Sequence, residues 1–207
     1  MHAKICSFIF LFISFTLFAT AQKKDLSNKG YKIGDTITDF NLKNIDGNFK
    51  KLVDYKNDKG IIIIFTCNHC PYSVAYEDRI IALHNKYQKL GYPVVAINPN
   101  DAKTYPIDSY ENMQERAQDK AFPFDYLHDE SQEVAKQFGA TNTPHVFIVS
   151  NHFPYFKVEY IGAIDDNSHE PQSVQTKYAE NAVDDLLKGK AVFMNKTKAI
   201  GCGIKWK

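Results

Sequence analysis

The chain has 207 residues, 44% of them hydrophobic, and a formal net charge of +1. This composition is typical of a folded globular protein, long enough for one domain with a large core. A nearly neutral chain lacks the excess positive charge that binds nucleic acids or anionic membranes, so no nucleic-acid partner is expected.

The first 21 residues have the pattern of a secretory signal peptide. Lys4 precedes an almost unbroken apolar run over 5–18, and Ala19-Thr20-Ala21 supplies a small-x-small cleavage site. The run has about 14 residues, whereas a membrane span needs roughly 20, so a cleaved signal is favoured over a membrane anchor. We therefore expect an exported protein, periplasmic or secreted, with no stable membrane anchor after cleavage.

Cleavage would leave three cysteines in the mature chain, at positions 67, 70 and 202. An oxidising compartment permits disulfides. Because three is odd, pairing of Cys67 with Cys70 leaves Cys202 as a buried thiol of the tail, an intermolecular partner or a third redox thiol.

The elements are expected in the following order. Residues 22–33 are polar and Lys-rich and predict a flexible leader before a single domain over 34–207. Asp46-Gly47 predicts an N-terminal β-hairpin. Ile61 to Phe65 predict a central strand covered on both faces.

Apolar residues then recur at spacings of four and three, which predicts a helix over about 73–90, ended by Gly91. With the apolar strand 92–98 this forms a parallel βαβ unit. The remaining expected elements are a surface helix at about 109–120 within an insertion, an extended stretch at 122–127, a helix from 129, strands at 145–149 and 156–164, and a helix over about 174–187. The fold class is α/β, with a mixed sheet.

The pattern Cys67-Asn-His-Cys70 lies between the central strand and the first helix. In a βαβ setting this is the thioredoxin-type redox motif. The partial positive charge at a helix N-terminus favours a thiolate and lowers the thiol pKa. We expect Cys67 to be exposed and to act as the nucleophile, Cys70 to be the resolving thiol and His69 to tune the pair. A zinc half-site or a static structural disulfide is the alternative, but no second Cys-x-x-Cys completes a zinc site.

Thr143-Pro144 precedes a predicted strand, and a cis bond is expected there. Such a bond lets Thr143 present its main-chain N–H and C=O to a bound peptide beside the thiols. His145 follows directly and is expected near the cysteine pair. Thr66, directly before Cys67, is counted with these three as a candidate substrate-binding residue.

Two further motifs are Tyr76-Glu-Asp-Arg-Ile80 and Gly201-Cys-Gly-Ile-Lys-Trp206. With all of these motifs, the sequence resembles the peroxiredoxin-like branch of the thioredoxin superfamily, the redoxins related to the AhpC/TSA proteins. The resemblance covers residues 33–207. It implies a thioredoxin-like fold, a central mixed β-sheet flanked by helices, with an N-terminal hairpin extension and a mid-chain insertion.

One departure from true peroxiredoxins bears on the chemistry. Those proteins share a Pro-x-x-x-Thr-x-x-Cys loop and a distant arginine that activate peroxide. Here Thr66 stands four before Cys70 without the matching proline, and the chain's two arginines are Arg79 and Arg116. Arg79 is expected to face solvent or to pair with Glu77 or Asp78.

The function expected from the sequence is therefore an exported thiol–disulfide oxidoreductase without a bound cofactor or metal. It would exchange with protein or small-molecule thiols and disulfides and need a separate thiol reductant or oxidant. A peroxiredoxin-like antioxidant peroxidase is the first alternative. The second is a metal-binding protein, because copper-delivering relatives of this fold combine a cysteine pair with a distant histidine, here His145.

Overall fold

The computed structural model describes residues 30–207. The expected signal peptide, 1–21, and most of the expected leader lie outside these residues. A seven-stranded sheet has the order β2-β1-β5-β4-β3-β7-β8, in which β3, β4 and β5 run parallel and the other pairs antiparallel. Its strands are β1 (Asn41–Asn44), β2 (Phe49–Lys51), β3 (Gly60–Phe65), β4 (Val94–Asn98), β5 (Asp125–His128), β7 (His145–His152) and β8 (Tyr155–Gly162). Two short strands, β6 (Asn142–Thr143) and β9 (Cys202–Gly203), form a second sheet.

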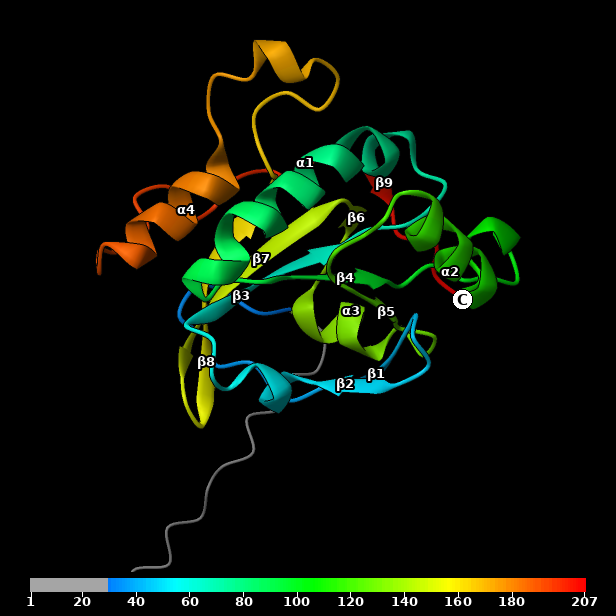
Figure 1. The fold of residues 1–207 in the computed structure, drawn as a ribbon, viewed down its shortest axis with the longest axis horizontal. Helices are drawn as coiled ribbons and strands as arrows, with labels where there is room; N and C mark the ends of the chain where they lie inside the picture. The colour runs from blue at the N-terminus through cyan, green and yellow to red at the C-terminus, as the bar shows by residue number, and fades with distance from the viewer. Residues whose placement is uncertain (1–29) are drawn as a thin grey trace, which may run out of the picture.

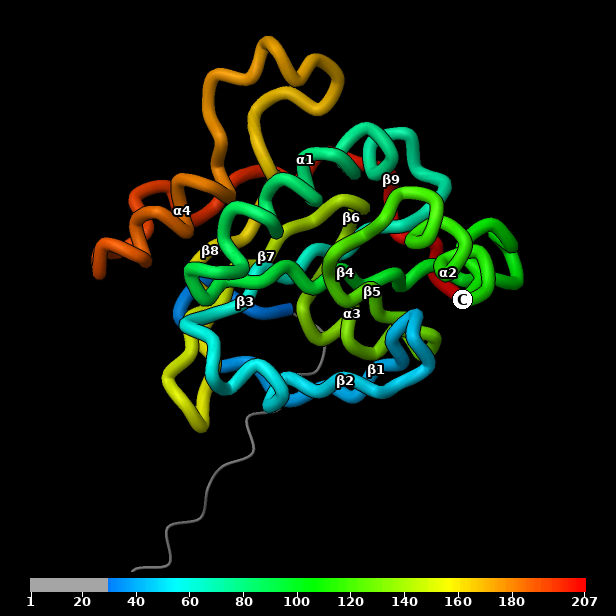
Figure 2. Tube along the Cα trace, viewed as in Figure 1, coloured from blue at the N-terminus to red at the C-terminus, as the bar shows by residue number. Residues whose placement is uncertain are grey.

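Helices cover both faces of the large sheet (Figure 1). They are α1 (Pro71–Tyr87), α2 (Tyr110–Asp119), α3 (Glu133–Phe138) and α4 (Tyr178–Leu187). α1 and α4 lie on one face, and α3 lies on the other. Figure 2 shows the C-terminal tail, in red, running from α4 to the start of α1. Within residues 30–207, no helix combines the length and apolar character that a membrane span requires.

The isoleucine run forms the central strand β3, as predicted. Ile61 and Ile63 belong to the core on the α3 side, and Ile62 and Ile64 belong to the core on the α1 side. All four are fully buried. An alternating strand exposes one face to water, whereas this strand is covered on both, so every position is apolar.

The other predicted elements are present with shifted ends. β1 and β2 form the expected hairpin, which also pairs with β5. β3, α1 and β4 form the parallel βαβ unit, and Gly91 ends the helical segment with a φ of 89°. α1 begins at Pro71, two residues earlier than expected, because proline is well suited to the first helical position. α4 begins at Tyr178 and not at 174.

The insertion after β4 is less superficial than expected. Ser109 caps α2 by accepting a hydrogen bond from the N–H of Asn112. Met113 is fully buried and Ala117 nearly so, in the same core as α1. One face of this mostly polar helix is therefore part of the domain core.

The last residues of the expected leader, 30–33, are docked on the domain. Tyr31 is buried, its ring packs edge-on against Phe138 with centroids 5.0 Å apart, and its N–H donates to the Phe138 carbonyl. Gly30 lies against Gly139, which ends α3 with a φ of 70°. A Cβ at Gly139 would lie 2.6 Å from the Gly30 Cα atom. The ordered domain thus begins before residue 34.

Two glycines allow a test of this contact. Gly139 and Gly189 both have left-handed φ angles, but a Cβ at Gly189 would meet nothing within 4 Å. We expect Gly189→Ala to lower the free energy of unfolding by roughly 1–2 kcal/mol through backbone strain alone. Gly139→Ala should cost roughly 1–3 kcal/mol more, because Gly30 must also move. Denaturant unfolding measures both, and equal losses would show that the contact contributes nothing.

Candidate active site around three cysteines

The register between β3 and β7 assembles the site. Phe65 pairs with His145, so the residues after β3 and those before β7 meet at one edge of the sheet. The Thr143–Pro144 peptide bond is cis, as expected. The Cys67 sulfur lies 3.1 Å from Thr143 Oγ1, and the Cys70 sulfur lies 3.2 Å from the Thr143 carbonyl oxygen. Thr143 therefore touches both cysteines of the motif.

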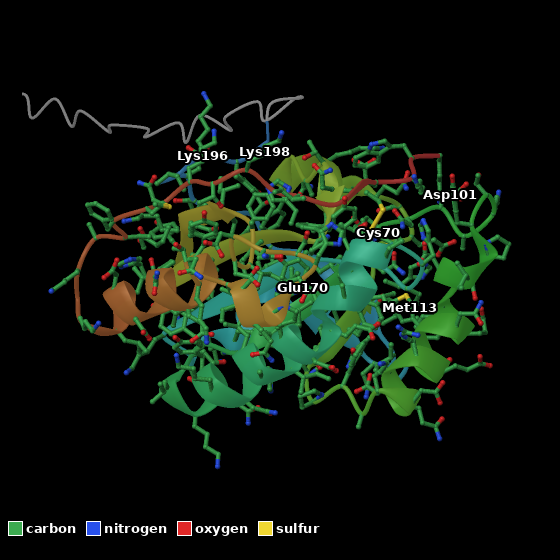
Figure 3. The ribbon with its side chains drawn as sticks, turned by 90° about the horizontal axis from the view of Figure 1, so that it is seen from above. Cys70, Asp101, Met113, Glu170, Lys196 and Lys198 are labelled. Atoms are coloured by element: carbon green, nitrogen blue, oxygen red, sulfur yellow. A yellow bond between two sulfur atoms is a disulfide. The ribbon has the colours of Figure 1, made fainter. Side chains whose placement is uncertain are left out.

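The third cysteine is also at this edge. Cys202 and Cys70 form a disulfide, with their Cα atoms 6.0 Å apart, and Figure 3 shows this bond at the start of α1. Strand β9 carries Cys202 and pairs antiparallel with β6, where Thr143 is the partner of Cys202. The tail thus folds back over the site, which places Cys202 among the redox candidates. The pairing of Cys67 with Cys70, expected from their spacing, is not the one in this structure, because Cys67 is a free thiol.

Cys67 differs from the expectation in exposure and in acidity. It is 3% exposed, so the prediction of an exposed sulfur is wrong. Burial raises the pKa of the Cys67 thiol, and the nearby Asp108 carboxylate raises it further. Hydrogen bonds of the sulfur with the Thr143 hydroxyl, with the N–H of Cys70 and with the Ser73 hydroxyl lower the pKa and offset part of this rise. The thiol is therefore less acidic than an ordinary cysteine, contrary to the helix-terminus argument.

Asp108 is the site residue that the sequence did not identify. It is fully buried in the turn before α2 and accepts hydrogen bonds from the Asn68 N–H at 2.7 Å and from Asn100 Nδ2 at 2.9 Å. His69 Nδ1 lies 2.5 Å from Asp108 Oδ2, and the His69 ring stacks on Tyr105. In the sequence, an Asp directly before Ser109 has the appearance of an ordinary helix-start residue, which is why nothing marked it.

His69 therefore binds a carboxylate. A ring nitrogen of His69, the Cys67 sulfur and an Asp108 oxygen all lie within 4.8 Å of one another. A thiol, an imidazole and a carboxylate are the donors that zinc prefers. Side chains of these three types also act in proton transfer, so their chemistry is compatible with metal binding or with proton transfer.

The other candidate residues have structural partners. Thr66 is buried and its N–H donates to the Ile97 carbonyl. Pro144 is buried beside Thr143. His145 accepts a hydrogen bond from the Thr141 N–H and packs on the Phe147 ring. The group of metal-ligand atoms around Cys67 contains His69 and Asp108 but not His145.

Both arginines are bound to carboxylates. Arg79 reaches Asp165 at 2.8 Å and also the carbonyls of Asn167 and Ser168, so the expectation that it faces solvent or pairs within its own helix is wrong. Arg116 makes two hydrogen bonds to Glu77. Both guanidinium groups are therefore held in ion pairs.

The fold and the site together define the class. A mixed sheet flanked by helices, with Cys-x-x-Cys at the start of the first crossover helix and a cis-proline beside it, is a thioredoxin-like redox protein. A sequence model of the AhpC/TSA family matches residues 33–160. The chain belongs to the AhpC/TSA family.

The chain is also similar to individual proteins. A solved structure of an uncharacterized conserved protein from Geobacillus kaustophilus is 38% identical with a TM-score of 0.79, and the match covers 87% of this chain and 95% of that one. The thiol-disulfide oxidoreductase ResA of Geobacillus thermodenitrificans is 25% identical over 120 residues, which span 56% of this chain and 63% of ResA. A putative thiol:disulfide interchange protein DsbE from Chlorobium tepidum shares the fold, with 21% identity, a TM-score of 0.59 and coverage of 76% of this chain and 99% of that one.

The burial of His145 predicts a pH dependence of stability. Burial lowers its pKa to about 4, from 6.5 in the unfolded chain. Between these values the unfolded chain binds a proton that the folded chain does not, so stability falls as the pH drops from about 7 to about 4, by on the order of 3 kcal/mol from this residue.

His145→Asn keeps an acceptor for the Thr141 N–H and removes the titrating ring. We expect it to flatten the fall in the free energy of unfolding between pH 7 and pH 4. His169→Gln, at an exposed position, is the matched control and should keep the wild-type slope. Denaturant unfolding across this pH range measures both, and an unchanged slope in His145→Asn would contradict the assignment.

Proposed function

We propose that the protein is an exported thiol–disulfide oxidoreductase whose three cysteines exchange one disulfide. The observation that carries the proposal is that Thr143 touches Cys67 and Cys70 and pairs with Cys202. Three sulfurs that share one neighbour can pass a disulfide from one pair to another without a large movement of the chain. Membership of the AhpC/TSA family and the likeness to ResA support this reading.

The roles of the two motif cysteines are the reverse of those expected from the sequence. Cys70 carries the disulfide to Cys202, so Cys70 is the residue that forms the mixed disulfide with a substrate. Cys67 is the free thiol beside it and resolves that bond. Its thiolate attacks the Cys70 sulfur, a Cys67–Cys70 bond forms, the bond from Cys70 to its partner breaks, and the partner leaves as a thiolate that takes up a proton.

The neighbouring residues have positioning roles in this proposal. Thr143 holds both sulfurs, and Pro144 and Thr66 fix the backbone on either side of them. His69, held by Asp108, accepts the proton that Cys67 must lose before it attacks. The external partners are protein or small-molecule thiols and disulfides, together with a thiol reductant or oxidant that resets the protein.

Export rests on the pattern of residues 1–21 and agrees with the presence of a disulfide, which persists in oxidising compartments. The mature domain then follows the cleavage site after Ala21. The N-terminal residue of the protein recovered from its native compartment checks this part of the proposal.

Trapping with oxidised glutathione tests the roles of the cysteines in the full mature chain. In Cys202→Ser, Cys70 should attack glutathione disulfide and Cys67 should resolve the adduct, which leaves a Cys67–Cys70 disulfide and two reduced glutathiones. In Cys67→Ser/Cys202→Ser the adduct should persist on Cys70, since the resolving thiol is missing. The rate at which the protein exchanges disulfides with glutathione should fall at least about tenfold when either Cys67 or Cys70 is replaced. Mass spectrometry of the alkylated protein identifies each species.

Cys70→Ser/Cys202→Ser is the matched comparison. It should collect little glutathione, because the pKa of its remaining thiol, Cys67, is raised. An adduct that forms mainly on Cys67 would restore the roles expected from the sequence. Failure of Cys202→Ser to form any internal disulfide would refute the oxidoreductase proposal itself.

Metal binding is a second candidate, favoured by the cluster of Cys67, His69 and Asp108. If the cluster binds zinc, the wild-type chain should retain one equivalent of Zn²⁺ through gel filtration and Asp108→Asn should lose it. Asp101→Asn is the control, because Asp101 lies in the same insertion and binds Thr104. Elemental analysis measures the metal, and equal retention in both variants, or none in the wild type, would exclude this candidate.

A further inference from the structure

The C-terminal tail lies in the site as an extended peptide. Asn142 pairs with Gly203 and Thr143 with Cys202, while the Ile204 N–H donates to the Thr141 carbonyl. The Asn142 side chain donates to the Gly201 carbonyl at 2.9 Å, and the Cys202 N–H points to the Cys70 sulfur at 3.4 Å. The strand is held mainly through its backbone, which is how an added β-strand is bound.

The residue before the bound cysteine has no room for a side chain. A Cβ at Gly201 would lie 2.2 Å from the Thr143 carbonyl oxygen, 2.6 Å from the Thr143 carbonyl carbon and 3.0 Å from the Pro144 nitrogen. All three atoms belong to the backbone beside the cis-proline, so none can rotate away. The residue after the cysteine is unrestricted, because a Cβ at Gly203 would meet nothing within 4 Å.

The second residue after the cysteine enters the core. Ile204 is 6% exposed and belongs to the apolar cluster on the α3 side of the sheet. Beyond it the Lys205 N–H donates to Asn100 Oδ1 at 2.9 Å, and its carbonyl accepts from the Asp101 N–H at 2.9 Å. The Lys205 ammonium lies 5.2 Å from the centroid of the Tyr105 ring. The tail therefore has glycine where no side chain fits, then the bonded cysteine, then an unrestricted position, then a buried aliphatic residue.

We infer that the β6 edge with Cys70 is the substrate site for extended peptides of the form Gly-Cys-x-aliphatic, and that the tail occupies it as an internal substrate. This inference rests on the proposed function. A peptide thiolate would attack the Cys70 sulfur, a Cys70–peptide disulfide would form, the Cys70–Cys202 bond would break, and Cys202 would leave as a thiolate and take up a proton. One disulfide is exchanged for another, and no further oxidant or reductant is consumed.

Peptides with the sequence of residues 199–206 test the selectivity. Their cysteine is activated with thionitrobenzoate, and the protein is the full mature Cys67→Ser/Cys202→Ser chain, in which Cys70 is the remaining thiol. Release of thionitrobenzoate follows attack of Cys70 on the peptide sulfur. Each rate is divided by the rate of the same peptide with glutathione, which removes differences in intrinsic reactivity. The peptide with Gly201→Ala should react at least about tenfold more slowly, and the peptide with Gly203→Ala should stay within about twofold of the parent.

The possible failures are distinguishable. Equal normalised rates for the three peptides, with Cys70 reactive towards each, would overturn the inference and leave the proposed function intact. A Cys70 that reacts with neither peptide nor oxidised glutathione would overturn both.

The tail itself provides a second measurement. In a glutathione redox buffer, the equilibrium constant for the Cys70–Cys202 disulfide should fall at least about tenfold in the full-length Gly201→Ala chain and change less than about twofold in Gly203→Ala. Alkylation and mass spectrometry quantify the two states. Equal changes in both variants would overturn the inference. Disulfide-linked dimers in the wild type would identify a second copy of the chain as the occupant and would overturn the assignment of an internal substrate.

Discussion

The site depends on one backbone contact, the antiparallel pairing of Thr143 with Cys202. Thr143 stands between the three sulfurs because β7 is in register with β3 and because the tail adds a strand on its other side. The side-chain hydroxyl faces Cys67, the carbonyl faces Cys70, and the strand edge receives Cys202. Pairing with the tail strand and contact with the sulfurs therefore involve the same residue.

Two opposing effects act on the pKa of the Cys67 thiol, the helix terminus and burial. A helix terminus stabilises a nearby charge by about 0.3–1 kcal/mol at exposed sites and up to about 2 kcal/mol when partly buried. Complete burial can shift a pKa by 3–5 units, each worth about 1.4 kcal/mol. Cys67 is almost completely buried and also faces the Asp108 carboxylate, so the helix terminus is outweighed and the pKa rises. The sequence placed Cys67 beside a helix correctly, but it held no information on how deeply the sulfur would lie.

The sequence predicted features that depend on neighbouring residues and missed contacts between residues far apart in the chain. Local patterns predicted the central strand, the helix after Cys70 and the left-handed Gly91, because these depend on neighbours in the chain. The cis bond before Pro144 was predicted only in combination with the distant cysteine pair. The Cys70–Cys202 bond joins residues 132 apart, and Asp108 reaches His69 from the insertion. Neither contact has a local signature. Arg79 is a similar case, since its partner Asp165 lies on the loop after β8.

A weakly acidic Cys67 is consistent with the proposed mechanism, in which this thiol resolves the mixed disulfide and does not attack first. While Cys70 is bonded to the tail, a neutral and buried Cys67 is poorly nucleophilic and is shielded from stray oxidants. Thiolate formation at Cys67 requires a proton acceptor, and a His69 nitrogen and an Asp108 oxygen lie within 4.8 Å of the sulfur. Attack on Cys70 removes the negative charge from the neighbourhood of Asp108, because the new disulfide is neutral. The Asp108 carboxylate opposes only the transient thiolate, so in the proposed mechanism it suppresses premature reaction of the neutral Cys67 thiol.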